Sequence, residues 1–185
     1  EHYNFSKISD FLDDNNIKSI SGVFYDFGVS SHQIDSPHRG FSFQHDSVLD
    51  MRMDTSQELS AKEVVNNYSY EELIRIFNDY GEENNSKKIA MSIINNRPIL
   101  TTTELVDVIE SSLPSQNPKF TKSSVRKIFP AVRIEVNNEI NEINKSLDSV
   151  KNFIKSNGVM IFLSYHSIED RTVKQFIDKE TRGCV

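Results

Sequence analysis

The sequence predicts an α/β fold in which an all-helical domain is inserted into a parallel sheet. Two short apolar runs, at residues 23–25 and 159–163, have the composition of buried strands, and polar side chains follow each run directly. From residue 58 to about residue 150, apolar residues instead recur at helical spacing. Strands on both sides of a helical stretch favour a sheet with a helical insertion between its segments.

The composition is typical of a soluble globular protein. The 185 residues are 37% hydrophobic and 26% charged, which suffices for one sizeable core or for one core with a smaller lobe. No apolar run reaches about 18 residues, so no membrane contact is expected. The formal net charge is −6, so any contact with RNA requires a local basic patch. The one cysteine, Cys184, offers no disulfide framework, which suits a reducing compartment such as the cytoplasm.

The polar residues after the first apolar run are candidate site residues. Asp26 ends this run, and Gly28, two serines and Gln33 follow within a few positions. Ligands of open parallel sheets bind beyond the carboxyl ends of the strands, so chemistry is expected at Asp26 and Gln33. The alternative is a strand followed by an ordinary polar turn, in which Gln33 is a solvated loop amide.

The second apolar run also ends on polar groups, Ser164 and His166. If the two strands are parallel, these residues open onto the same sheet edge as Asp26. His166 is then a candidate polar wall of an active site. The alternative is a structural hydrogen bond at the start of a final helix, which Ser167-x-x-Asp170 is expected to cap.

Helical patterns account for most other segments. A short amphipathic helix is expected before the first strand, with one apolar face formed by Phe5, Ile8, Phe11 and Leu12. Residues 28–57 lack a period and predict an extended loop, tied down by Phe41, Phe43, Leu49 and Met51. Three capping boxes, each with Glu three residues after the cap, are expected to start helices at Ser60, Ser69 and Thr101.

The last helical pattern is the longest. A stripe at spacings of three and four predicts a long helix through Ile128, Val132, Val136, Ile140, Ile143 and Leu147. Pro130 is expected to kink this stripe or to mark its first turn. Asn157-Gly158 is expected to end the helical region, just before a fully buried second strand.

Basic residues suggest where a nucleic acid would bind. Lys119, Lys122, Arg126 and Lys127 surround Phe120, and cations beside an aromatic ring suit phosphate contact and base stacking, although a solvated loop has the same composition. Arg39, Arg52 and Arg133 either clamp RNA phosphates or pair with nearby aspartates to pin the loop. No metal is expected, because the spacings of His32, His38, His45 and His166 match no compact zinc pattern.

Six segments, in this order, carry a family resemblance: Asp26–Gln33, Arg39-Gly-Phe-Ser-Phe43, Leu49-Asp-Met-Arg-Met53, Tyr80-Gly-Glu-Glu83, Phe129–Ile134 with Val136-Asn137 and Glu139, and Tyr165–Arg171. Together they resemble the bacterial-type small-subunit ribosomal RNA cytosine-N4 methyltransferases, which use S-adenosylmethionine (SAM). One departure is Pro130, where the family usually has Gln. The resemblance implies part of a class I, Rossmann-like methyltransferase sheet, with core segments at residues 1–47 and 129–185 and a helical, substrate-side insertion at 48–128.

The same resemblance implies roles for individual residues. Phe5 matches an aromatic residue beside the adenine of SAM, although core packing at a helix start is the alternative. Asp26 and Gln33 match positions that contact SAM, and Asp26 and His166 are the candidate catalytic residues. By resemblance, the family's glycine-rich SAM loop precedes Phe5, so the chain is expected to be a fragment that lacks this loop and is inactive by itself.

Two other functions remain open at this point. One is a non-catalytic RNA- or ribosome-binding module that keeps the methyltransferase fold. The other is a different nucleotide-binding α/β enzyme. The partner expected from the resemblance is small-subunit ribosomal RNA or the ribosomal subunit itself.

Overall fold

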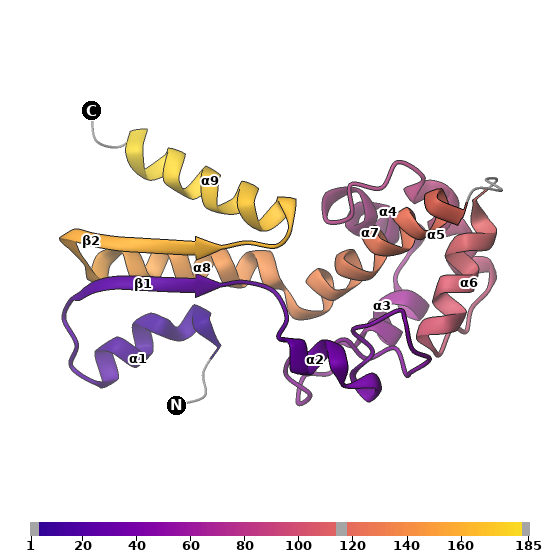
Figure 1. Ribbon diagram of the computed structural model, residues 1–185, viewed down its shortest axis with the longest axis horizontal. Helices are drawn as coiled ribbons and strands as arrows, with labels where there is room; N and C mark the ends of the chain where they lie inside the picture. Colours follow the sequence, from indigo (N-terminus) through magenta and orange to yellow (C-terminus); the bar gives the residue numbers. More distant parts are fainter. Residues whose placement is uncertain (1–3, 114–117, 183–185) are drawn as a thin grey trace. The chain divides into compact units, whose positions relative to one another are not determined.

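The computed structural model describes residues 4–113 and 118–182, which form two compact units (Figure 1). Unit 1 contains residues 1–28 and 138–185, and unit 2 contains residues 29–137. The family resemblance assigns residues 29–47 and 129–137 to the methyltransferase core. In the structure, both segments pack in the helical unit, where the rings of Phe43 and Phe129 meet edge to face with centroids 5.4 Å apart. Cys184 and the start of the loop expected from Pro114 to Pro118 lie outside the described residues.

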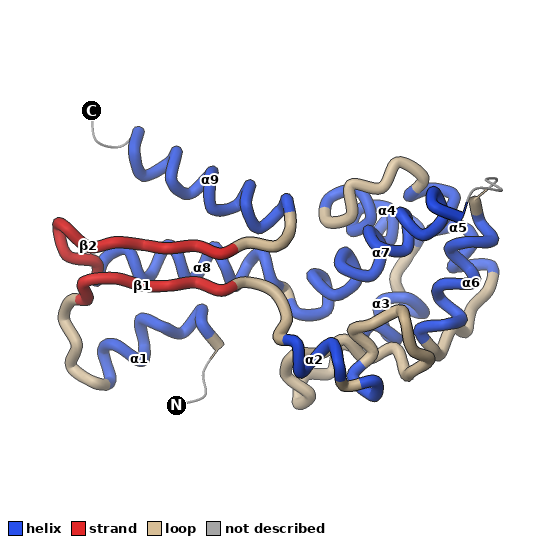
Figure 2. The backbone as a smooth tube through the Cα atoms, viewed as in Figure 1, coloured by secondary structure: helices blue, strands red, loops and turns tan. Residues whose placement is uncertain are grey.

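Unit 1 contains a parallel pair of strands, β1 (Ile20–Asp26) and β2 (Ile154–Leu163), drawn in red in Figure 2. Their register pairs Val23 with Met160 and Asp26 with Leu163. The expected parallel sheet is thus confirmed. The expectation that Asn157-Gly158 ends the helical region is wrong, because both residues lie inside β2, near the point where the register with β1 is irregular.

Helices cover one face of this sheet. They are η1 (Phe5–Lys7), α1 (Ile8–Asp14), α8 (Glu139–Val150), η3 (Lys151–Phe153) and α9 (Ser167–Arg182). The core beneath them consists of Tyr25, Phe27, Ile143, Leu147, Val150 and Val173. Side chains alternate along a strand, so the neighbours of these residues face the other way: Phe24 is 60% exposed and Ile161 52%. The expectation of a fully buried second strand is therefore wrong.

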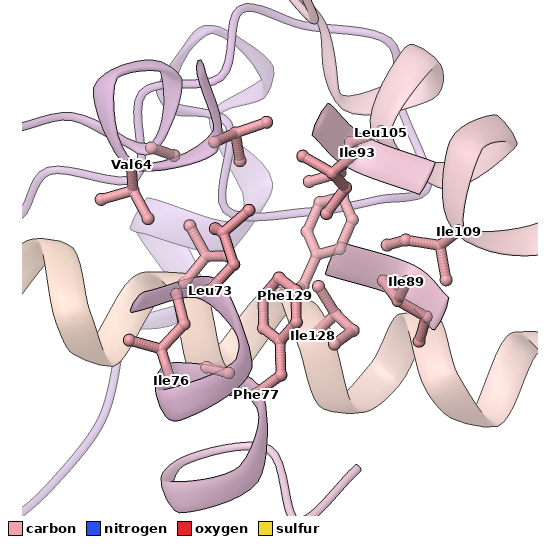
Figure 3. Close-up of a cluster of buried hydrophobic side chains, with 14 of the residues drawn as sticks. Val64, Leu73, Ile76, Phe77, Ile89, Ile93, Leu105, Ile109, Ile128 and Phe129 are labelled. Carbon is pink, nitrogen blue, oxygen red and sulfur yellow. The ribbon is translucent and has the colours of Figure 1, made fainter. Parts of the chain in front are cut away.

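Unit 2 consists of helices and loops around a larger core. Its helices are α2 (Ser31–Asp35), η2 (Pro37–Arg39), α3 (Ala61–Asn67), α4 (Tyr70–Asp79), α5 (Ser86–Asn95), α6 (Thr102–Ser112) and α7 (Pro118–Asn137). The three expected capping boxes, at Ser60, Ser69 and Thr101, are confirmed. Figure 3 shows side chains from α4, α5, α6 and α7 meeting in the core, among them Phe77, Ile93 and Ile128.

The segment expected to be one extended loop is instead partly helical, because Ser30 and Gln33 form a capping box that starts α2. Its remainder is tied down as expected, with Leu49 and Met51 fully buried. The Arg52 guanidinium donates two hydrogen bonds to the Asp50 carboxylate, at 2.7 and 3.0 Å, and it also donates to the backbone carbonyls of Thr55 and Gln57. This pairing agrees with the structural alternative for Arg52, in which it pins the loop.

The long stripe is divided between the two units. Helix α7 ends at Asn137, and Asn138 adopts a left-handed conformation (φ 51°) before α8 begins. Asparagine tolerates this conformation better than most residues, and a break of this kind leaves the apolar spacing intact. Ile128 consequently packs in the core of unit 2, whereas Leu147 packs in the core of unit 1. Pro130 lies within α7 rather than in its first turn.

Truncating one core side chain in each unit should destabilise mainly the unit that contains it. Ile128→Ala and Leu147→Ala each delete a fully buried branched side chain, which should cost about 2–5 kcal/mol. In hydrogen exchange followed by mass spectrometry, we expect Ile128→Ala to lower protection mainly within residues 29–137. Leu147→Ala should lower it mainly in β1, α8 and β2. Equal loss in both units for either variant would contradict the division of the stripe.

Candidate functional site

The candidate site lies at the carboxyl ends of β1 and β2. Asp26 pairs with Leu163, and the Phe27 amide donates to the Leu163 carbonyl at 3.0 Å. Because the strands are parallel, the chain leaves both at the same end of the sheet (Figure 1). The residues that follow, Phe27-Gly28 and Ser164–His166, are therefore brought together. We call Asp26, Gly28, Tyr165, His166 and Glu169 the strand-end site.

Gly28 lies against the second strand end. Its φ of 90° falls in a region that residues with a side chain rarely adopt. A Cβ atom built there would lie 3.7 Å from Tyr165 Cδ2 and 3.8 Å from Glu169 Oε1, which are ordinary contacts. The backbone conformation, and not a lack of space, therefore requires glycine at this turn.

Asp26 and Tyr165 interact across the two strand ends. Partial desolvation, and after it the nearby Asp26 carboxylate, raise the pKa of Tyr165. The Tyr165 side chain is nonetheless 70% exposed, and Asp26 is also exposed. An accessible carboxylate beside a phenol can accept and donate hydrogen bonds to a polar ligand.

Glu169 fixes the second strand end. Its side chain is buried, and Oε2 accepts hydrogen bonds from the backbone amides of Tyr165 at 2.8 Å and His166 at 3.2 Å. A carboxylate in the first turn of α9 also suits the positive end of the helix dipole. The expectation that Asp170 completes the cap of this helix is wrong. The Asp170 side chain instead pairs with Lys174 at 2.7 Å on the exposed side of the helix.

His166 takes part in the start of the same helix. Its Nδ1 atom accepts a hydrogen bond from the Ile168 amide at 3.4 Å. This contact is the structural alternative that the sequence left open. The catalytic role of His166 stays a prediction.

Phe5 lies on the covered face of the sheet. Its ring centroid is 6.3 Å from those of both Tyr25 and Phe27. Its carbonyl accepts a hydrogen bond from Ser146 Oγ at 2.9 Å. Asp26 lies between Tyr25 and Phe27 in the strand, so its side chain projects to the opposite face. The structure thus places Phe5 in aromatic packing, and its expected contact with adenine stays a prediction.

Gln33 lies in unit 2 and starts helix α2. Its Oε1 accepts a hydrogen bond from the Ser30 backbone amide at 2.9 Å, and the Ser30 side chain accepts one from the Gln33 amide at 3.3 Å. The side chain is therefore held in a capping box and is not a freely solvated amide. Whether it contacts SAM remains a prediction.

The expected basic cluster lies along α7. Lys119, Lys122 and Arg126 are exposed at spacings of three and four, which places them on one side of the helix. Phe120 beside them is 47% exposed. Lys127 differs, because its ammonium group donates to the Glu82 carbonyl at 2.9 Å.

The described residues contain neither a metal-type cluster nor a membrane-spanning helix. In these ranges no three His, Cys, Asp or Glu side chains gather as a metal site would require. His32, His38 and His45 lie in unit 2, whereas His166 lies in unit 1. Within residues 4–113 and 118–182, none of the helices combines the length and the apolar character needed to cross a bilayer.

A comparison with protein families decides the identity of the fold. The family model of the MraW methylase family matches residues 1–185. The chain belongs to this family. The resemblance found from the six sequence segments is thereby confirmed, and the family is that of the small-subunit ribosomal RNA cytosine-N4 methyltransferases. The parallel strands with their helices are part of its Rossmann-like methyltransferase fold, and membership indicates a SAM-dependent methyltransferase.

SAM, the cofactor that the family implies, fits the described residues only in part. The Asp26 carboxylate can accept hydrogen bonds from hydroxyl or amino groups at the strand end. A glycine-rich turn before a helix ordinarily holds such a cofactor. Among the described residues, the glycines with positive φ are Gly28, ahead of the five-residue α2, and Gly40, at the end of η2. The described residues thus offer a carboxylate that suits SAM, but no glycine-rich turn at the start of a helix.

The sequence places Tyr165 and Glu169 within the family segment Tyr165–Arg171 but indicates no role beside Asp26 for either of them. Glu169 lies three residues after His166, which is the spacing of a capping box, and this signal was available. The partnership of Tyr165 with Asp26 carries no sequence signal, because the two residues meet only once β1 and β2 pair in register.

Glu169 should contribute more to the free energy of unfolding than its neighbour Asp170 does. Glu169→Gln weakens two hydrogen bonds to a buried charged acceptor, so we expect it to lower the free energy of unfolding by about 1–3 kcal/mol. The matched variant, Asp170→Asn, removes an exposed ion pair and should cost about 0.5 kcal/mol. Urea denaturation followed by circular dichroism compares them. Equal losses would contradict the role assigned to Glu169.

Proposed function

We propose that this protein transfers a methyl group from SAM to the N4 amino group of a cytidine in small-subunit ribosomal RNA. The observation that carries the proposal is the position of Asp26 near Tyr165, whose backbone amide Glu169 holds, at the carboxyl ends of two parallel strands in a chain that belongs to the MraW methylase family. A ribosomal substrate would place the protein in the cytoplasm.

The strand-end site suits the chemistry of an amino group. The exocyclic amine of cytosine is a poor nucleophile, because its lone pair is delocalised into the ring. When bound, SAM supplies a methyl group on an electrophilic sulfonium centre. The protein must then orient the amine and accept hydrogen bonds from it as positive charge develops. The Asp26 carboxylate is the acceptor proposed for this task.

Tyr165 and Glu169 support Asp26 in this proposal. The Tyr165 hydroxyl lies near the Asp26 carboxylate and can donate a hydrogen bond that restricts its orientation. Glu169 in turn holds the Tyr165 backbone amide at 2.8 Å. The exposed Tyr165 ring also offers a flat surface against which an unstacked base could lie, and a target base must leave its stack before it reacts.

The RNA would also contact the basic cluster on α7. Lys122 and Arg126 are exposed and lie one turn apart, at a distance suited to successive phosphates, with the ring of Phe120 nearby. The chain has a net charge of −6, so a local cluster of this kind is what RNA binding requires.

A second function is favoured by one specific observation. Gln33, a position expected to contact SAM, is held in a capping box, and the described residues offer no glycine-rich turn for the cofactor. A chain that keeps the fold and the basic cluster without the cofactor would be an RNA- or ribosome-binding module. Methyl transfer and SAM binding separate the two functions.

Asp26 should be necessary for methyl transfer. In a form of the protein that also carries a glycine-rich SAM loop, we expect Asp26→Asn to lower the rate of transfer from tritiated SAM by about 100-fold. The matched control, Asp148→Asn, removes an exposed carboxylate of α8 and should leave the rate unchanged. The product should be N4-methylcytidine by mass spectrometry of digested RNA. Near-normal activity of Asp26→Asn would overturn its role, and another methylated base would overturn the proposed substrate.

The 185-residue chain alone should bind SAM weakly and be inactive. The described residues offer a strand-end carboxylate but no helix-start amides in a glycine-rich turn. Calorimetric titration of the chain with SAM should therefore give a dissociation constant well above the micromolar range. Micromolar binding would show that the residues described suffice for the cofactor.

A further inference from the structure

A groove follows the outer side of helix α5 in unit 2. Three successive turns of the helix line it, with Lys87 and Lys88, then Met91 and Ser92, then Asn95 and Asn96. Tyr70 from α4 and Ser112 from α6 also line it. The groove has a volume of about 480 Å³, so it can hold a flexible chain that lies along the helix.

The charge in this groove is positive and uncompensated. No Asp or Glu lines it, whereas Lys87 and Lys88 are exposed. Among the residues described, neither lysine side chain forms an ion pair or a hydrogen bond. In unit 1 the exposed lysines Lys145 and Lys174, by contrast, both pair with a carboxylate.

The position of the two lysines does not stabilise the helix. They lie in the first turn of α5, where the partial charge of the helix is positive and a cation is unfavourable. Stabilisation of the helix therefore does not explain why lysines occupy these two positions. An anion bound in the groove would neutralise both lysines.

The middle and far end of the groove offer surfaces for bases. Met91 is 46% exposed, although Ile89, Ala90 and Ile93 on the same helix are fully buried. Tyr70 adds an aromatic ring, and Asn95 adds an exposed amide that can both donate and accept. Cations at one end, with apolar, aromatic and amide groups beyond them, match the alternation of phosphates and bases in a single strand.

We propose that the groove along α5 binds a single-stranded segment of RNA, with phosphates at Lys87 and Lys88 and a base against Tyr70 and Met91. This inference rests on the proposed function, and it adds a second RNA contact to the basic cluster on α7. An acidic protein segment would also meet the two lysines, but it would make no specific use of the ring and the amide at the other end.

Salt dependence of RNA binding tests the groove. The probe is a fluorescein-labelled single-stranded RNA of about 12 nucleotides and mixed sequence, titrated with the 185-residue chain between about 50 and 200 mM salt. Each phosphate contact in a single strand contributes about 0.7 to the slope of log affinity against log salt. Lys87→Gln/Lys88→Gln should therefore lower the slope by about 1.4. When the salt concentration rises fourfold, the variant should therefore lose about sevenfold less RNA affinity than the unaltered chain loses.

Three variants complete the experiment. Lys145→Gln/Lys174→Gln removes the same total charge from unit 1 and should leave the slope unchanged. Tyr70→Leu keeps an apolar side chain but loses the ring, so it should weaken binding at least about fivefold without changing the slope. Lys122→Gln/Arg126→Gln reports on the α7 cluster separately.

The outcomes distinguish the groove from the proposed function. If only Lys122→Gln/Arg126→Gln flattens the salt dependence, the groove is not an RNA site and the proposed function stands. If the unaltered chain binds no RNA, both the groove assignment and the ribosomal RNA substrate are overturned. If Lys87→Gln/Lys88→Gln abolishes binding of poly-glutamate and leaves RNA binding intact, the occupant is an acidic protein segment and the proposal is wrong.

Discussion

The parallel pairing of β1 with β2 is the interaction on which the candidate site depends. The register that joins Asp26 to Leu163 brings together two segments that are more than a hundred residues apart in the sequence. Once paired, the strands place the Asp26 carboxylate beside the Tyr165 hydroxyl and Gly28 against Glu169. A shift of one residue would turn every side chain of a strand to the other face, so the buried Tyr25 and the partly buried Phe162, whose rings stack at 5.5 Å, also fix the position of the site.

The pairing forms although a complete helical unit lies between the two strands in the sequence. Residues 29–137 have their own core, and the loop at their start is held by contacts within the same unit, such as Asn137 bound to the Met51 carbonyl at 2.8 Å and to the Met53 amide at 2.6 Å. Because this unit has its own core and holds its own loops, it can be inserted without changing the packing of the sheet. The left-handed Asn138 then separates α7 from α8 where the chain returns to unit 1.

The sequence was most informative where one signal determines one element. Ser60, Ser69 and Thr101 capped helices as expected, because a capping box depends only on residues three positions apart. The two apolar runs also formed the expected parallel strands. The sequence was less informative where one local pattern is compatible with two different structures. The stripe from Ile128 to Leu147 keeps its spacing across a break, so periodicity could not reveal that it serves two cores. Asn157-Gly158 often ends helices but here lies in a strand.

The candidate site shows the same limit. Asp26 could be predicted because it ends an apolar run, whereas its partner Tyr165 could not, since their contact arises from register alone. Phe5 and Gln33 were expected from resemblance, and each has a structural partner in this chain: Phe5 packs on aromatic rings and Gln33 caps a helix. The family assigns the reaction class, while the residues around Asp26 suggest how an amino group would be held.

The most direct test of the strand-end site is a titration of the ¹⁵N-labelled chain, followed by nuclear magnetic resonance, with S-adenosylhomocysteine and with cytidine monophosphate. This measurement detects binding that is too weak for calorimetry and reports it residue by residue. We expect the amide signals of Asp26–Gly28 and of Tyr165–Glu169 to shift with either ligand, and the shifts to be lost in Asp26→Asn. Shifts confined to other residues, or shifts that persist in Asp26→Asn, would contradict the assignment of this site.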